Sequence, residues 1–152
     1  MLRSFLIGLV AGQRGLTPLA VIAAGARRGT LPPGAPLAGL MAKPLIAGGV
    51  VALAAAEMAG DKMKSAPDRI VPAGLIVRTL TSAYAGAVFA PPGRRVRGGA
   101  LAVVTALGAS YVGWRLRCAS MRRYGQTATG AVEDALVLGS GLAVALNRGR
   151  PI

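Results

Sequence analysis

The chain has 152 residues, a length that predicts one domain over residues 1–152. Only 15% of the residues are charged, against about 25% in a typical soluble domain, and 53% are hydrophobic. With no histidine and one cysteine, the chain cannot form an internal disulfide, and we expect neither a metal site nor a cofactor. The apolar residues lie in long blocks, so a lipid bilayer is the expected solvent for most side chains.

The net charge of +13 comes from 18 Lys and Arg against 5 Asp and Glu. Proteins that bind nucleic acid gather such residues into a basic patch. Here the basic residues lie mainly between the apolar blocks, for example at 27–28 and 94–97, as they do in loops that face anionic headgroups. We therefore expect the lipid bilayer, and no nucleic acid, as a partner.

Five apolar blocks follow one another, each close to the 17–25 residues, roughly, of a transmembrane helix. They are rich in Ala, Leu and Gly and do not alternate with polar residues, which predicts helices rather than strands. The predicted fold class is all-α, an integral membrane helical bundle of about five transmembrane helices. Four spans result instead if the first or the second block is re-entrant. The predicted spans are residues 2–26, 44–60, 70–90, 98–116 and 128–146.

The first block carries a helix-breaking segment. Pro18 removes a backbone donor and clashes with the carbonyl of Arg14, and Gly15 lowers helix propensity at the same place. We predict that the first helix is kinked or broken near Arg14–Pro18. Broken helices at membrane depth often form binding sites. The alternative is a simple kink whose backbone groups are satisfied by Thr17 and its neighbours.

Several charged residues fall inside the predicted spans, where a charge costs at least about 3 kcal/mol unless it faces the bundle interior and finds a partner. Glu57 and Asp61 are four residues apart and share a helix face, so we hypothesise that Arg14, Arg78 or both turn inward to them. One interpretation of this cluster is an ion-pair network that fixes helix register, and a second is an ion-coupled polar path. In a third, residues near the ends of the spans simply extend their charged groups to the membrane surface. The predicted intramembrane polar cluster comprises Arg14, Glu57, Asp61, Lys62, Arg78, Glu133 and Asp134.

The fourth block ends in Trp114, Arg115 and Arg117, an aromatic and basic pattern typical of an anchor at the membrane interface. Five spans would divide Lys and Arg equally between the two sides, so the positive-inside rule does not orient the chain. Small residues four apart, such as Gly8 and Gly12, predict close helix packing within the bundle.

Four segments resemble, in order, those of a bacterial membrane family without assigned activity, domain of unknown function 4126. Residues 12–20, Gly-Gln-Arg-Gly-Leu-Thr-Pro-Leu-Ala, resemble its G-x-R-(S/G)-x-T-P-L-A opening, and residues 57–62 its E-x-x-x-D-K element. In the third segment residues 67–69, residues 72–76 and Arg78 match, and in the fourth residues 132–135 match. Gln13 and Gly15 depart from the commoner aliphatic residue and serine, which puts a hydroxyl role at position 15 in doubt. The resemblance implies a multi-pass protein of the bacterial inner membrane.

No catalytic motif is present, and the serines have no histidine as a base, so we expect no enzyme activity and no catalytic residue. The first functional hypothesis is a small transporter or channel-like protein with an unknown substrate. The alternative is a structural or accessory subunit, as a homo-oligomer or beside a larger membrane partner. A polar cavity reaching Arg14 and Glu57 would favour transport, whereas a dry, tightly paired cluster would favour the subunit. A membrane enzyme acting on lipid is the third and weakest hypothesis.

Overall fold

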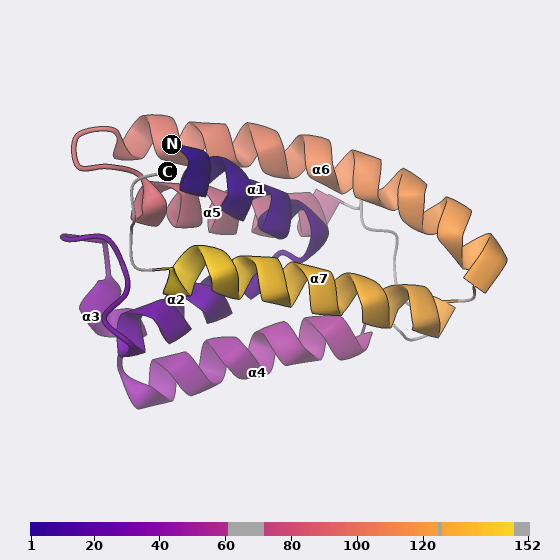
Figure 1. Cartoon of the computed structure of the whole chain (residues 1–152), viewed down its shortest axis with the longest axis horizontal. Helices are drawn as coiled ribbons and strands as arrows, with labels where there is room; N and C mark the ends of the chain where they lie inside the picture. The colour runs from indigo at the N-terminus through magenta and orange to yellow at the C-terminus, as the bar shows by residue number, and fades with distance from the viewer. Residues whose placement is uncertain (61–71, 125, 148–152) are drawn as a thin grey trace.

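A computed structural model of the chain describes residues 1–60, 72–124 and 126–147, with the side chains of 121–127 excepted (Figure 1). The described residues are all-helical and contain no strand, which confirms the predicted all-α class. The helices are α1 (Leu2–Gln13), α2 (Thr17–Arg27), α3 (Ala38–Met41), α4 (Pro44–Gly60), α5 (Pro72–Phe89), α6 (Arg95–Tyr124) and α7 (Gln126–Leu146).

The first apolar block breaks where the sequence predicts. α1 ends at Gln13, and Arg14 takes an extended conformation with φ −138° and ψ 113°. α2 begins at Thr17 and holds Pro18 in its first turn. A missing N–H does no harm there, because the first amides of a helix have no partner within it. Pro18 therefore starts the second helix rather than kinking a continuous one.

The chain reverses direction at this break, so α1 and α2 form an antiparallel hairpin (Figure 1). Near the start of α1, Arg3 donates from Nε and Nη2 to the carbonyl of Val144, at 3.2 and 2.5 Å. Just after α2, Thr30 donates to the carbonyl of Ala145 at 2.8 Å. Both ends of the hairpin thus lie at the end of α7. Where the sequence predicts one span over residues 2–26, the structure has two short antiparallel helices whose outer ends lie on the same side of the bundle.

The longer helices, α4 to α7, run in alternating directions beside this hairpin (Figure 1). α1 packs against α5, α6 and α7, whereas α2 packs against α4 and α7. By length and composition, two helices in the described part of the chain could cross a membrane, Arg95–Ser120 and Ala128–Leu146, a test that the core helix of a soluble protein also passes. α1 and α2, with 12 and 11 residues, are too short to cross a hydrocarbon core of about 30 Å.

Small residues bring α1 into backbone contact with α6. A Cβ atom on Gly8 would lie 2.7 Å from the carbonyl oxygen of Ala102, and one on Gly12 would lie 2.5 Å from that of Ala106. Distances this short leave no room for a methyl group. The predicted spacing of small residues therefore does mediate packing inside the bundle at these two positions.

Replacing Gly8 by alanine should lower the free energy of unfolding by about 1–3 kcal/mol, because the methyl group would overlap the α6 backbone. Gly108 is the matched control, since it lies in α6 with no atom within 4 Å of its Cβ position. Gly108→Ala should leave stability unchanged or raise it by up to about 1 kcal/mol. Thermal unfolding followed by circular dichroism measures both, and equal shifts would contradict the packing.

Candidate functional site

Four charged side chains from four different segments lie at one level of the bundle. Arg14 follows α1, Glu57 lies in α4, Arg78 in α5 and Asp134 in α7. Each is about 12 residues, hence about 18 Å, from the helix end that lies on the side of the two termini, at 1.5 Å per residue. Figure 1 shows these four helix ends on one side of the molecule. The hairpin tip therefore meets a charged layer in the middle of the bundle.

Glu57 binds the backbone of the hairpin tip. Its Oε1 accepts a hydrogen bond from the amide of Gly15 at 2.7 Å, and its Oε2 accepts one from the amide of Leu16 at 2.9 Å. Leu16 is the N-cap of α2, and no side-chain hydrogen bond caps this helix from within. The Glu57 carboxylate of α4 thus acts as the cap of α2. Its negative charge is also favourable at the positive end of the α2 dipole.

Arg14 forms a buried ion pair with Asp134. Its Nε donates to Oδ1 at 2.8 Å, and its Nη2 lies 2.5 Å from the same oxygen. Arg14 is 2% exposed and Asp134 is 8% exposed. The hypothesis that Arg14 turns inward is correct, but its acidic partner lies in α7. Glu57 is occupied by backbone amides instead, which spacing along the sequence does not reveal.

Arg78 completes the described layer. It is buried, and a Cβ atom on Gly15 would lie 3.3 Å from its Cγ and 3.4 Å from Oε1 of Glu57. The stem of Arg78 therefore packs against the hairpin tip beside the carboxylate. A residue larger than glycine at position 15 would crowd both neighbours, so a small residue suits the tip. Asp61 and Lys62, the other predicted members of the cluster, lie outside the described residues.

Glu133 forms a second ion pair, with Arg117. Its Oε2 lies 3.5 Å from Nη1 of Arg117, across α6 and α7. Arg117 is buried, because a helix turns by about 100° per residue and places it on a different face from Arg115. The membrane-interface anchor at Trp114, Arg115 and Arg117 stays a prediction. Arg115 is exposed, with its Cζ 6.0 Å from the ring centre of Tyr111, and Trp114 is half-buried.

Two polar residues tie the end of α1 to α6 and were not among the predicted site residues. Gln13 donates from Nε2 to the carbonyl of Ala109 at 2.8 Å. The hydroxyl of Ser110 donates to the carbonyl of Gly12 at 2.9 Å, which satisfies one of the last carbonyls of α1. A glutamine and a serine inside apolar blocks were the available signal, since buried polar groups in apolar surroundings require partners.

The hydroxyl of Thr17 is fully buried at the start of α2 and has no hydrogen-bond partner among the described residues. Thr17 directly follows Leu16, one of the two residues whose amides Glu57 binds. No group of three side chains suited to a metal ion occurs in residues 1–60, 72–124 and 126–147. The layer therefore compensates charges around a broken helix, with the Glu57 carboxylate bound to the two amides of the tip.

Comparisons with protein families, with characterised proteins and with solved structures find no match for this chain. The resemblance to domain of unknown function 4126 stays a prediction from the motifs quoted above.

Replacing Asp134 by asparagine should lower the free energy of unfolding by about 3–5 kcal/mol, because it removes the negative charge that lies 2.5 Å from Nη2 of the buried Arg14. Glu133→Gln is the matched control on the neighbouring residue. It should cost less, because its charges lie 3.5 Å apart and Glu133 is more exposed than Asp134. Chemical unfolding measures the two differences, and similar values would show that the Arg14–Asp134 pair is not the dominant one.

Proposed function

We propose that this chain is a multi-pass membrane protein in which α4, α5, α6 and α7 cross the bilayer and the α1–α2 hairpin is re-entrant. The observation that carries the proposal is that large apolar side chains are exposed along the four longer helices while several charged side chains are buried between the helices. Leu45 is 85% exposed and Leu136 is 68% exposed, whereas Arg14 and Ser4 are buried. Exposed apolar residues on the four longer helices include Leu45, Val51, Leu53, Leu80, Val104, Leu116 and Leu136.

The hairpin tip is compatible with membrane depth. Irregular backbone within the hydrocarbon region is tolerated only where protein groups satisfy its amides. Glu57 does this for Gly15 and Leu16. The tip lies about 18 Å along α1 in a core of about 30 Å, which is close to the midplane. A re-entrant hairpin therefore explains why the first block carries a break, a charge and a proline together.

Within this fold we propose a small transporter or channel-like protein, not an enzyme. In transporters with broken helices, the N-terminus of a half-helix at the midplane faces the anionic group of a substrate. Glu57 occupies that place in this chain, and Thr17, whose hydroxyl is buried without a partner among the described residues, directly follows the amides that it binds. Protonation of Glu57 would remove the charge that binds the amides of Gly15 and Leu16. Such a step would free the tip for a solute or release the hairpin from α4.

The alternative is a structural or accessory subunit without transport activity. It is favoured by the pairing of the charged layer, since Arg14 binds Asp134 and Glu57 binds two amides. The sole role of such a network can be to fix the position of the hairpin. The exposed apolar faces would then pack against further copies of the chain or a larger membrane partner.

The proposed location is the inner membrane of a bacterium, which rests on the resemblance given above. The hairpin changes the charge count between the two sides, because Arg3 joins the loops at 27–43 and 94–97 on the side of the termini. That side then carries more Lys and Arg than the other. By the positive-inside rule, we propose that it faces the cytoplasm.

Both termini should lie on the same side of the membrane, because four crossings and one re-entrant hairpin make an even number. Epitope tags at the two ends of the chain, treated with protease in sealed vesicles, should both be digested or both be protected. Vesicles opened with detergent are the control in which both tags are digested. Protection of one tag alone would require an odd number of spans, as in the five-span prediction.

Replacing Glu57 by glutamine should stop transport without unfolding the protein, since the amide oxygen still accepts one backbone hydrogen bond but cannot titrate. Proteoliposomes under a panel of pH, cation and anion gradients measure the flux. The flux of the variant should fall to the level of protein-free liposomes. Glu133→Gln is the matched control and should keep the wild-type flux.

The subunit alternative gives a different result in the same experiment. The wild-type protein would show no flux under any gradient, and Glu57→Gln would lower the yield of folded protein. That pair of results would overturn the transport proposal.

A further inference from the structure

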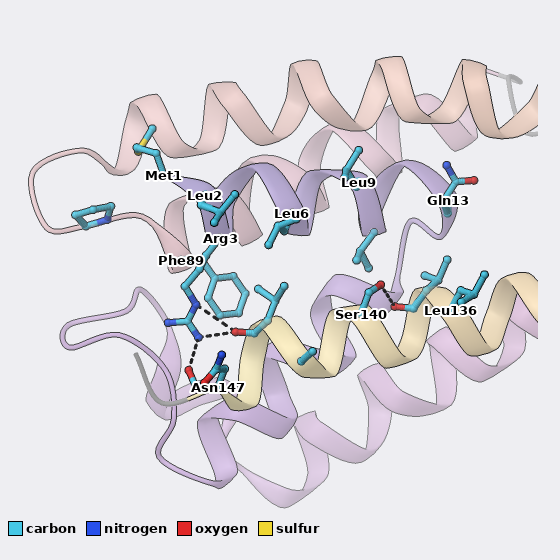
Figure 2. A pocket seen from close by; sticks show the side chains of 15 residues that line it. Met1, Leu2, Arg3, Leu6, Leu9, Gln13, Phe89, Leu136, Ser140 and Asn147 are labelled. Atoms are coloured by element: carbon cyan, nitrogen blue, oxygen red, sulfur yellow. Dashed lines mark hydrogen bonds between the residues drawn. The ribbon is translucent and has the colours of Figure 1, made fainter. Parts of the chain in front are cut away.

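A groove of about 680 Å³ lies between α1 and α7 and extends from Arg3 to Gln13 (Figure 2). Leu2, Leu6 and Leu9 from α1 line one wall, and α7 forms the other with residues that include Leu136 and Val144. Polar side chains occur mainly at its two ends. None of the residues that line the groove is acidic.

Arg3 marks one end of this groove and is held firmly in place. Besides its bonds to Val144, Nη2 donates to the carbonyl of Asn147 at 3.1 Å, and Cζ lies 5.1 Å from the ring centre of Phe89. These contacts use Nε and Nη2. No described residue accepts a hydrogen bond from Nη1, which Figure 2 shows on the side of the guanidinium away from the two carbonyls. Arg3 therefore presents a fixed cation with donors to spare.

The length of the groove fits one membrane leaflet. It runs along α1 from Arg3 to Gln13, a distance of about 15 Å at 1.5 Å per residue. Half of a hydrocarbon core of about 30 Å is also about 15 Å. An apolar trough of this length with a cation at its outer end complements an acyl chain that carries an anionic headgroup.

We propose that this groove is a binding site for one anionic phospholipid, with an acyl chain between α1 and α7 and the phosphate on Arg3. The proposal rests on the membrane placement proposed above and does not depend on transport. The apolar walls would take the chain of any lipid, so the preference for an anionic headgroup comes from the guanidinium. A phosphate on Nη1 would complete the hydrogen bonding of Arg3 without displacing its bonds to α7.

The test compares two lipids with the same acyl chains, phosphatidylglycerol and phosphatidylcholine. Each is titrated into the full chain purified in detergent, and bound lipid is counted by native mass spectrometry while thermal unfolding is recorded. Both lipids carry a phosphate, but the choline cation of phosphatidylcholine offsets the attraction of its phosphate to Arg3. We therefore expect one phosphatidylglycerol to bind about fivefold more tightly than phosphatidylcholine. The bound lipid should also raise the unfolding temperature.

Two pairs of variants separate the groove from the general positive charge. Arg3→Gln should remove the preference for phosphatidylglycerol, whereas Arg97→Gln, at an exposed position of α6, should keep it. Ala143→Leu fills the groove without touching Arg3 and should remove tight binding of both lipids. Ala100→Leu, at an exposed position outside the groove, should bind like the wild type.

Equal affinity for the two lipids would overturn the proposal, as would an equal loss in Arg3→Gln and Arg97→Gln. If Arg3→Gln does not fold, unchanged binding in Ala143→Leu overturns it as well. A protein that stays in membranes but shows no lipid preference would leave the membrane placement standing. A monomer that is soluble without detergent would refute the placement and the lipid site together.

Discussion

The structure depends on the two hydrogen bonds from the hairpin tip to Glu57. A chain that stops a helix in the middle of an apolar bundle exposes amides that no local side chain can reach. Here a carboxylate from α4 accepts both, from Gly15 and Leu16. Without it, the tip would carry unsatisfied donors in apolar surroundings, at a cost of several kcal/mol. The reversal of the chain, and thus the order of the helices around it, follows from this contact.

The other charges of the layer can be understood from the same constraint. The partly buried carboxylate of Glu57 brings negative charge close to the start of α2, and the stem of Arg78 packs against the same tip residue, Gly15. Arg14, also at the tip, pairs with Asp134 of α7. The tip is therefore held from α4 and α7 at once, and each contact fixes the depth at which α1 ends.

The sequence was sufficient to predict the helical class and the position of the break. Local chemistry decides both, because Gly15 and Pro18 act on their own turn of helix. The direction of the chain after the break could not be predicted, since it depends on which distant groups satisfy the freed amides. The same reason explains why Arg14 was expected near Glu57 but pairs with Asp134, 120 residues away. The groove at Arg3 depends on the same reversal of the chain, so it could not be predicted from the sequence either.

A carboxylate from another helix is an unusual choice of cap, and its consequence differs from that of a local serine or aspartate. A local cap keeps its hydrogen bond whenever the helix exists, because it belongs to the same turn. Glu57 can leave without unfolding α2, since only the spacing between α2 and α4 has to change. The α1–α2 hairpin is thereby joined to the bundle by a contact between two helices rather than by one within a single turn.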